Sequence, residues 1–560
     1  MVLRRSYFLT WMITLWCGPG QSVILPAMAE MGTPAPRIQT HVRKQPRLID
    51  NGMAISWAIT AVIFVLHLYF NKGYGYFRDE FNYMSCGDHL QWGYVDQPPL
   101  VPFLVRICRG LLGDSLRSIR LIPALATSLL VVQTAVFARE LGGRRYALLL
   151  TAIAIALAPQ YSSNGSLLGT NCLEPTFWLG AAWFSLRAIK RENPRYWVWA
   201  GVMIGLGMEN KYSILLLAFG IIVGLLLTPQ RRALLSRWFW LGILAALVIF
   251  LPNLLWNVHY HWPFLELMRN IRSEHRDVVL GPVGFFFSQL METNFATGII
   301  WLAGLYAFLV AVCFRPYRFL GWSFLFCYVA MFLLHGKSYY LAPIYPMLIA
   351  AGCVALENWF DRAEGRNRNW DWLRHTLAWT VLCSGLYCLP ITVPALSPDA
   401  FLVYARNFLP FKLPVNEYSH ARVALPQWYA DQFGFKEIAG EVEIAWDRLP
   451  ASERADCAIF GQDYGQAGAV DFFGRAHGLP QALSGDRTYY LWGPRGYSGN
   501  CMIVIDDSRE NLERLFEQVV YVGTSVENRY ALEGPTAVFI CKGKRFESLG
   551  NLWPKLKRWQ

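Results

Sequence analysis

The sequence predicts an α-helical polytopic membrane protein that ends in a soluble α/β domain. Of its 560 residues, 54% are hydrophobic and only 16% are charged, and the mean hydropathy is +0.27. Soluble domains are nearer a quarter charged. The apolar residues form blocks of roughly 18 to 22, the length that crosses a bilayer core of about 30 Å. Two regions follow, a helical bundle over 53–393 and a soluble domain over 397–560.

The apolar blocks predict about eleven transmembrane helices. The predicted spans are 53–71, 117–138, 146–162, 174–188, 196–209, 212–228, 238–256, 297–313, 319–334, 341–358 and 374–393.

The basic residues predict the orientation of these spans. They gather in every second loop, as expected for loops on the cytoplasmic side. The first span then runs outward, and the soluble domain lies outside. Because the net charge of +12 is spread over short loops and not over one soluble face, it does not indicate nucleic-acid binding. The predicted outer segments are 72–116, 162–173, 210–211, 257–296, 335–340 and everything after about 394.

The amino-terminal segment, 1–52, has two interpretations. Arg4-Arg5, an apolar run at 7–16 and Ala27-Met28-Ala29 resemble a secretory signal with its cleavage site. Cleavage would leave the basic stretch 41–47 outside, against the predicted orientation. We therefore favour an uncleaved segment or a wrongly chosen start.

The carboxyl-terminal region alternates between strand and helix patterns, which favours a small α/β domain. Its three cysteines, Cys457, Cys501 and Cys541, allow one disulfide, although unpaired thiols are an equal alternative. Predicted strands cover 455–460, 501–505, 519–522 and 537–541, and predicted helices cover 427–449, 465–477 and 508–518.

Acidic residues in the outer segments are the first candidates for chemistry. Asp79 and Glu80 follow the first span, in a loop that also holds Asp96. An ordinary solvated loop is the simpler interpretation, but aromatic residues flank the pair beside a membrane face. The run 102–112 is too short to span, and we expect it to lie along the interface. Glu174 opens the fourth span, where an acid at a helix start is also favourable.

Two outward-facing lysines complete the pattern. Lys211 lies in a tight outer turn, and Lys337 precedes Ser338-Tyr339-Tyr340. A cation beside the bilayer suits a lipid phosphate, although snorkelling to the interface is an equal alternative. Acids could deprotonate an acceptor while cations hold a phosphate leaving group. The combination indicates transfer of a group from a lipid-linked phosphate.

Four segments resemble glycosyltransferase family 39, which contains protein O-mannosyltransferases and bacterial aminoarabinose transferases. The resemblance covers about 53–360 and implies a GT-C architecture, polyprenyl-phosphate sugar donors and inversion at the anomeric carbon. The matching segments are Phe77-Arg78-Asp79-Glu80, Val95-Asp96-Gln97-Pro98-Pro99-Leu100, Glu174-Pro175, and Lys337-Ser338-Tyr339-Tyr340-Leu341-Ala342-Pro343-Ile344-Tyr345-Pro346.

The resemblance also implies roles for individual residues. Asp79 would be the general base, with Glu80 beside it, and Glu174 would stand where relatives usually carry a second essential Asp. Lipid A-modifying relatives have a phosphate-binding Lys where this chain has Gln97. Either Lys211 or Lys337 would therefore hold more of the donor phosphate, or the donor differs. The residues expected to line the donor and acceptor are Asp96, Gln97, Tyr339, Tyr340 and Tyr345.

The sequence therefore predicts a multi-pass glycosyltransferase of a bacterial inner membrane. It would move a hexose or pentose from a polyprenyl phosphate to an unidentified periplasmic lipid, glycan or protein. No cofactor is expected, because phosphate is already a good leaving group; a divalent metal is possible but has no support in the sequence. The alternatives are a transporter or flippase of lipid-linked sugars and a non-catalytic glycan-binding receptor. Membrane lipids are expected partners.

Overall fold

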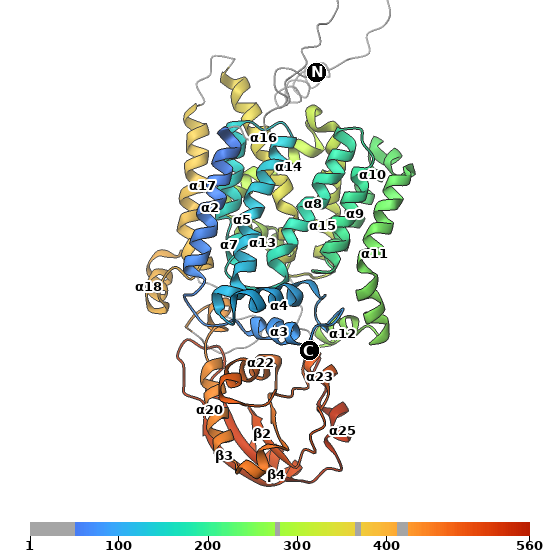
Figure 1. The fold of residues 1–560 in the computed structure, drawn as a ribbon. Coiled ribbons are helices and arrows are strands. Elements are labelled where there is room, and N and C mark those ends of the chain that lie inside the picture. Colours follow the sequence, from blue (N-terminus) through green and yellow to red (C-terminus); the bar gives the residue numbers. More distant parts are fainter. Residues whose placement is uncertain (1–50, 275–279, 365–370, 411–423, 560) are drawn as a thin grey trace, which may run out of the picture.

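A computed structural model describes residues 51–274, 280–364, 371–410 and 424–559. It shows an elongated molecule with a helix bundle at one end and a soluble domain at the other (Figure 1). The predicted amino-terminal segment, 1–52, lies almost entirely outside the described residues.

Each of the eleven predicted apolar segments falls on a helix of the bundle. The helices are α2 (Asn51–Phe70), α5 (Leu116–Glu140), α6 (Arg145–Leu157), α8 (Thr170–Lys190), α9 (Tyr196–Met208), α10 (Ile214–Leu226), α11 (Arg237–His259), α14 (Phe295–Leu309), α15 (Arg318–Leu333), α16 (Tyr345–Glu364) and α17 (Asp371–Thr392). Short helices connect them: α7 (Pro159–Asn164), α13 (Pro282–Thr293), η1 (Pro229–Leu235), η2 (Val312–Tyr317) and η3 (Ser338–Ile344).

Fewer than eleven of the described helices have the length and hydropathy of a membrane span. Five described stretches are long and apolar enough to span, or up to six if α10 and the sharply bent η1 form one span. Three further apolar helices, α6, α9 and α14, are shorter. Eleven crossings therefore stay a prediction.

Glycines allow the closest helix contacts in the bundle. A methyl group on Gly201 of α9 would lie 1.9 Å from the carbonyl oxygen of Gly242 on α11. Gly304 of α14 and Gly352 of α16 approach each other's helix backbone to the same degree. Small residues at such crossings bring helix backbones together where packing, and not the hydrophobic effect, drives association in a bilayer.

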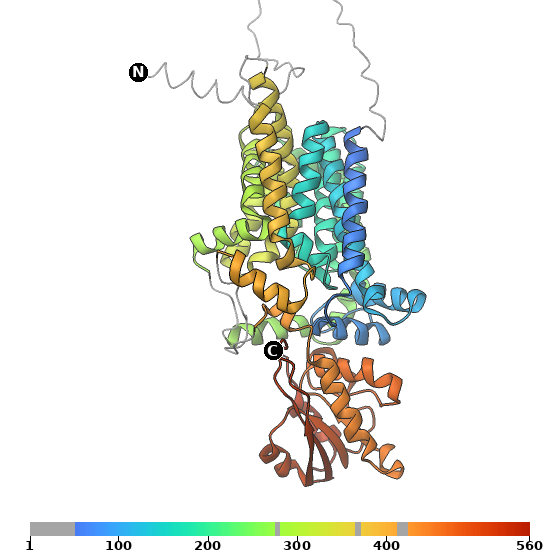
Figure 2. The ribbon, with the colours of Figure 1, turned by 90° about the vertical axis from the view of Figure 1, so that its left-hand side faces the viewer.

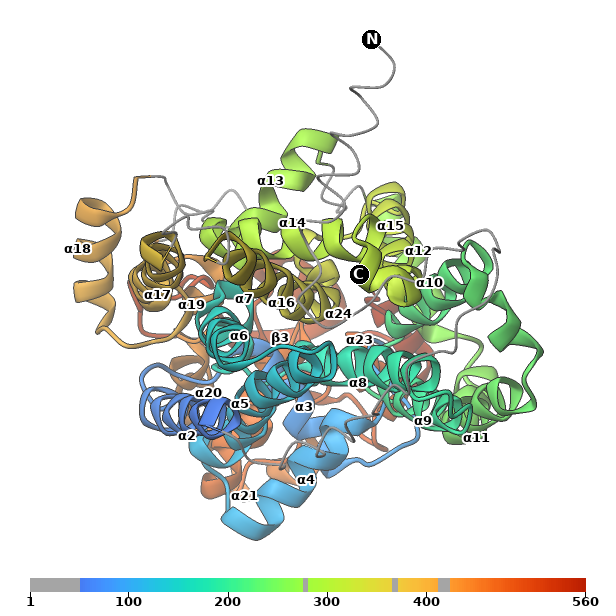
Figure 3. The same ribbon diagram turned by 90° about the horizontal axis from the view of Figure 1, so that it is seen from above.

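Four short helices lie at the end of the bundle that faces the soluble domain. They are α3 (Arg78–Asp88), α4 (Leu100–Leu112), α12 (Pro263–Ser273) and α18 (Pro398–Phe408). Figure 2 shows α3 and α4 lying across the bundle direction, and Figure 3 shows α4 and α18 at its edge. The predicted helix over 102–112 is confirmed as α4. It exposes Phe103, Ile107 and Leu111 at intervals of four residues, as an interfacial helix would.

The soluble domain contains one mixed four-stranded sheet. The strands are β1 (Cys457–Phe460), β2 (Cys501–Ile505), β3 (Phe516–Thr524) and β4 (Ala537–Lys544), in the order β1-β2-β4-β3. Only β1 and β2 run parallel. The helices are α19 (Gln427–Ala430), α20 (Phe435–Asp447), α21 (Ala451–Arg454), α22 (Tyr464–Phe473), α23 (Arg487–Trp492), α24 (Arg509–Leu515) and α25 (Leu549–Leu552), with η4 (Gly474–His477) and η5 (Trp553–Leu556).

The four predicted strands are confirmed, but the helix predicted over 508–518 is too long. It ends at Leu515, and β3 begins at the buried Phe516, which pairs with Lys544 of β4. Pairing along β4 therefore overrides the local helical pattern. A disulfide joins Cys457 and Cys501, which lie opposite each other on β1 and β2, while Cys541 is a buried free thiol.

Candidate active site

The first turn of α3 carries both predicted acids, in two different environments. Negative charge there is favoured by the helix dipole. Asp79 is partly exposed, whereas Glu80 is fully buried. The Glu80 carboxylate accepts a hydrogen bond from the backbone N–H of Phe77, at 2.9 Å, so it also caps its own helix.

Glu80 is part of a buried ion pair with Arg120 of α5. The guanidinium donates from Nε and Nη2 to the two carboxylate oxygens, at 2.8 and 2.9 Å. The backbone N–H of Leu168 donates to the same carboxylate, at 3.1 Å. Every oxygen of Glu80 is thus engaged, which suits a structural anchor for α3 better than the predicted place beside the catalytic base.

Asp79 and Asp96 meet two side chains of the soluble domain. The Tyr464 hydroxyl donates to Oδ1 of Asp79, at 2.5 Å. The Arg487 guanidinium donates from Nη1 to Oδ2 of Asp96, at 2.6 Å. Asp96 also accepts from the Asn82 amide of α3, at 3.2 Å. These contacts join the first outer loop to the soluble domain.

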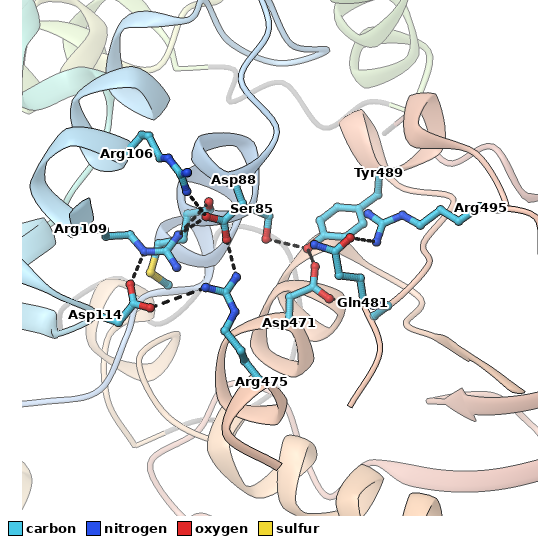
Figure 4. A network of polar contacts seen from close by, with 12 residues as sticks. Ser85, Asp88, Arg106, Arg109, Asp114, Asp471, Arg475, Gln481, Tyr489 and Arg495 are labelled. Atoms are coloured by element: carbon cyan, nitrogen blue, oxygen red, sulfur yellow. Dashed lines mark hydrogen bonds and ion pairs between the residues drawn. The ribbon is translucent and has the colours of Figure 1, made fainter. Parts of the chain in front are cut away.

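A second polar network joins the same two parts further along α3 (Figure 4). Arg475 of the soluble domain contacts Asp88 at 2.7 Å, and Arg109 of α4 contacts the same carboxylate at 3.1 Å. The Tyr489 hydroxyl donates to Ser85 Oγ, at 2.7 Å. The soluble domain is therefore fixed to the loop that carries Asp79.

The remaining predicted charges form a second cluster at the ends of α8 and α10 that face the soluble domain. Lys211 pairs with the buried Glu174 at 3.2 Å, and its ammonium lies 4.1 Å from the centre of the Tyr340 ring. Tyr340 packs edge-on against Tyr339, and Lys337 lies over the Tyr339 ring at 5.9 Å. Both predicted phosphate-binding lysines thus meet at one pair of tyrosines.

The start of α8 connects the two clusters. The backbone N–H of Thr170 donates to the Tyr83 hydroxyl, at 3.4 Å, and Tyr83 lies one helical turn after Asp79 on α3. The Asn210 amide donates to the carbonyl of the same Thr170, at 2.8 Å, immediately before Lys211. Asp79 and Lys211 are therefore held at the same end of the bundle through one short backbone segment.

Two predicted lining residues are buried. Gln97 is 3% exposed, and its side-chain amide oxygen is buried without a hydrogen-bond partner among the described residues. Tyr345 is 0% exposed and packs on Trp301 and Phe324. Its hydroxyl donates to the side-chain amide oxygen of Gln289, at 3.0 Å. Tyr345 thus belongs to the bundle core and does not line a surface, because it is the first residue of α16 and faces the other helices.

Burial changes the acidity of carboxyl groups on the soluble side of this interface. Desolvation raises the pKa of Asp431 to about 6 and that of Asp486 to about 6. Asp486 also accepts a hydrogen bond from the backbone N–H of Tyr464, at 3.3 Å. Among the described residues, no group of three or more His, Cys, Asp or Glu side chains is arranged to hold a metal ion.

Sequence reasoning missed Arg487 and Arg120, and it singled out Tyr464 without predicting its partner. The stretch Asp463-Tyr464-Gly465 does follow strand β1, where sites of α/β domains often lie, but this pattern names no partner. Arg120 lies within a predicted span. A charge inside an apolar segment is the signal that could have identified it as the partner of a buried acid.

Part of the chain is similar to known glycosyltransferases. Residues 96–256 match the family model of the dolichyl-phosphate-mannose-protein mannosyltransferases. The chain is 27% identical over 235 residues to the lipid A galacturonosyltransferase RgtD of Rhizobium johnstonii, covering 38% of this chain and 48% of RgtD. It is 28% identical over 302 residues to the undecaprenyl phosphate-alpha-4-amino-4-deoxy-L-arabinose arabinosyl transferase 1 of Pseudomonas fluorescens, covering 49% of this chain and 50% of that protein.

The fold extends the similarity over most of the chain. The crystal structure of ArnT from Cupriavidus metallidurans bound to undecaprenyl phosphate superposes with a TM-score of 0.56 at 15% identity, covering 88% of this chain and 98% of ArnT. Its apo form gives the same TM-score at 16% identity, over 87% of this chain and 97% of ArnT. In sequence, the chain spans about half the length of the curated relatives that it matches.

The helix bundle with its attached soluble domain is therefore a membrane fold of the GT-C class. Within that class, the chain is similar to the mannosyltransferase family model and to lipid A glycosyltransferase and aminoarabinose transferase relatives, in agreement with the motifs that resemble glycosyltransferase family 39.

Proposed function

We propose that the protein is a glycosyltransferase that moves a sugar from a polyprenyl phosphate to an acceptor outside the cytoplasm. The observation that carries the proposal is the shared position of a partly exposed acid, Asp79, and a paired cation, Lys211, at one end of the bundle. One group can take a proton, and the other can hold a phosphate. Both lie where a membrane-embedded lipid would present its headgroup.

In the proposed reaction, Asp79 accepts the proton of the acceptor hydroxyl or amine as the acceptor attacks the anomeric carbon. The bond from that carbon to the phosphate oxygen breaks, and the polyprenyl phosphate leaves. Attack opposite the leaving group inverts the anomeric centre. No step requires a metal, since the phosphate leaves as a stable anion.

Lys211 is the residue best placed to hold the donor phosphate. Glu174 and the amide oxygen of Asn171, at 2.7 Å, hold the ammonium near the Tyr340 ring. We assign Glu174 the role of holding Lys211 in place, and Lys337 that of a second cation at the same tyrosine pair. A lysine acts as a point charge on phosphate, so its position decides its contribution.

Names of relatives support this donor class. One relative is named as an undecaprenyl phosphate aminoarabinose transferase, and the ArnT crystal structure contains undecaprenyl phosphate. We infer the same lipid class for this protein and a multi-pass location in a bacterial inner membrane, with the soluble domain on the periplasmic side. The sugar and the acceptor are separate questions, which mass spectrometry of envelope lipids and glycans from cells with and without the gene addresses.

A transfer assay tests the proposal. The purified full-length protein is mixed with radiolabelled undecaprenyl-phosphate sugars and an extract of envelope lipids and glycans. We expect label to leave the lipid with the unchanged protein, and about 100-fold more slowly or worse with Asp79→Asn. Asp399 is an exposed acid of α18, and Asp399→Asn is the matched control, which should transfer the sugar at the rate of the unchanged protein.

The other outcomes point to the other two functions. Full transfer by a folded Asp79→Asn variant would overturn the assignment of the base. Movement of labelled lipid across vesicles without loss of its sugar would indicate a flippase. Retention of labelled donor or glycan without turnover would indicate a receptor.

A further inference from the structure

Two residues of the soluble domain connect the acids of the first outer loop. Tyr464 is the first residue of α22, and Arg487 is the first residue of α23. Tyr464 contacts Asp79 at 2.5 Å, and Arg487 contacts Asp96 at 2.6 Å. The Arg487 guanidinium also lies 4.2 Å from the centre of the Tyr464 ring. The two acids are thus joined by one continuous path through the soluble domain.

The position of the Tyr464 hydroxyl is tightly constrained. The side chain is only 3% exposed, and Arg78 lies over the same ring as Arg487, at 5.4 Å. Asp463 caps the start of α22 by accepting from the backbone N–H groups of Gly465 and Gln466, at 2.6 and 2.9 Å. These contacts fix both ends of the tyrosine, so its hydroxyl holds Oδ1 of Asp79 at a defined place.

Helix α22 approaches α3 too closely for this contact to be incidental. A methyl group on Gly468 would lie 2.7 Å from Cβ of Phe81, and one on Gly465 would lie 2.5 Å from Cγ of Arg78. The backbone N–H of Val95 also donates to Thr488 Oγ1, at 3.1 Å, next to Arg487. The interface is therefore packed around the two polar contacts.

We infer that Tyr464 and Arg487 are positioning residues of the transfer site, which makes the soluble domain part of the catalytic unit. Tyr464 fixes the Asp79 carboxylate through Oδ1 and directs Oδ2 toward the proton of the acceptor. Arg487 holds Asp96 and supports the Tyr464 ring. This inference rests on the proposed function, since the acceptor proton passes to Asp79 while the sugar leaves its phosphate.

Two tyrosine variants test the inference by activity. We expect Tyr464→Phe to lower kcat by about 10- to 100-fold with the donor KM within about twofold, because misplacing a base by about 1 Å has effects of that size. Tyr489→Phe is the matched control, because it removes from the same interface a hydroxyl that contacts Ser85 and not Asp79. This variant should keep kcat within about threefold of the unchanged protein. Equal kcat values for the two variants would overturn the inference.

Two arginine variants test the second residue. Arg487→Lys keeps the charge beside Asp96 and should retain several-fold more activity than Arg487→Met. If both variants transfer as fast as the unchanged protein, Arg487 has no positioning role. The amount of folded protein, measured by size-exclusion chromatography in detergent, normalises each rate.

Thermal unfolding tests the Tyr464–Asp79 contact without any activity. Tyr464→Phe, Asp79→Ala and the double variant are compared with the unchanged protein. We expect each single change to shift Tm and the double change to shift it by less than the sum, because the two groups share one hydrogen bond. Strict additivity would overturn the inference, whereas non-additivity in a protein without transfer activity would contradict the proposed function alone.

Discussion

The Glu80 carboxylate and the Arg120 guanidinium form a buried ion pair in which the side chains are 0% and 1% exposed. Arg120 also donates to the carbonyl oxygens of Asn71 and Gly75, each at 2.9 Å, and to the Gln432 amide oxygen at 3.2 Å. The pair therefore ties α3 to α5, to the end of α2 and to the segment between α19 and α20 of the soluble domain. This network holds the helix on which Asp79 lies.

The first prediction is that Arg120→Met destabilises the protein by about 3–5 kcal/mol, because it leaves Glu80 buried without its partner. Thermal unfolding in detergent measures this as a lowered Tm. The double change Arg120→Met with Glu80→Gln should recover part of the loss. Arg106→Met, which removes a largely exposed partner of Asp88, is the control and should cost less than about 1 kcal/mol. A similar Tm for both arginine variants would contradict the prediction.

The different environments of the Asp79 and Glu80 side chains show what a sequence can predict. Their position after the first span predicts that both lie at one end of the bundle, and the structure has both at the end that faces the soluble domain. Adjacent residues on a helix point about 100° apart, however, so one enters the core while the other faces the soluble domain. Arg120, the partner of Glu80, lies 40 residues away in sequence, and Tyr464, the partner of Asp79, lies 385 residues away. Such long-range contacts leave no local pattern.

The strands of the soluble domain were predictable because each is a short apolar run between turns. The boundary at Phe516 was not, since pairing with β4 decides it. The choice of disulfide partners likewise depends on which strands become neighbours, and β1 and β2 are 44 residues apart at their cysteines.

The second prediction concerns the donor phosphate. Lys211→Met should raise the donor KM by about 10-fold or more, because one charge-assisted contact to phosphate contributes roughly 1.5–3 kcal/mol. Lys211→Arg should have a smaller effect. The donor KM of Glu174→Gln should lie between those of the two Lys211 variants, because this change keeps the lysine but removes its ion pair. Steady-state transfer over a range of undecaprenyl-phosphate sugar concentrations gives these values; an unchanged KM in Lys211→Met would remove this residue from the donor site.

The third prediction is that Asp471 of the soluble domain makes the stability of the folded protein depend on pH. Burial raises the pKa of this carboxyl to about 6 in the folded protein, from an ordinary value of 3.8. Below the ordinary value, both folded and unfolded chains are protonated, so the full contribution to stability is present. As the pH rises through about 6, the folded protein must ionise a buried group, and that contribution is lost.

Asp471→Asn should remove this dependence. The variant amide oxygen can still accept from the Ala482 N–H, which lies 2.7 Å from Oδ1 of Asp471. Between pH 4 and pH 7, the stability of the unchanged protein relative to the variant should fall by about 2–3 kcal/mol. Unfolding temperatures at several pH values measure it, with the largely exposed Asp447→Asn as a control. A constant difference between protein and variant would show that Asp471 has an ordinary pKa.

The fourth prediction concerns the contact between α9 and α11. The Gly201 Cα lies so close to α11 that an added methyl group would lie 1.9 Å from the Gly242 carbonyl oxygen, and backbone cannot move aside as a side chain can. Gly201→Ala should therefore separate the two helices and cost about 1–3 kcal/mol, despite the higher helix propensity of alanine. Gly110→Ala on α4 is the matched control, because nothing lies within 4 Å of its added methyl group. That variant should gain roughly 0.5–1 kcal/mol from propensity alone. Tm of both variants is measured in the same detergent. A lower Tm for Gly201→Ala and a higher Tm for Gly110→Ala would establish that α9 and α11 cross in backbone contact. A higher Tm for both variants would show that the two helices are further apart.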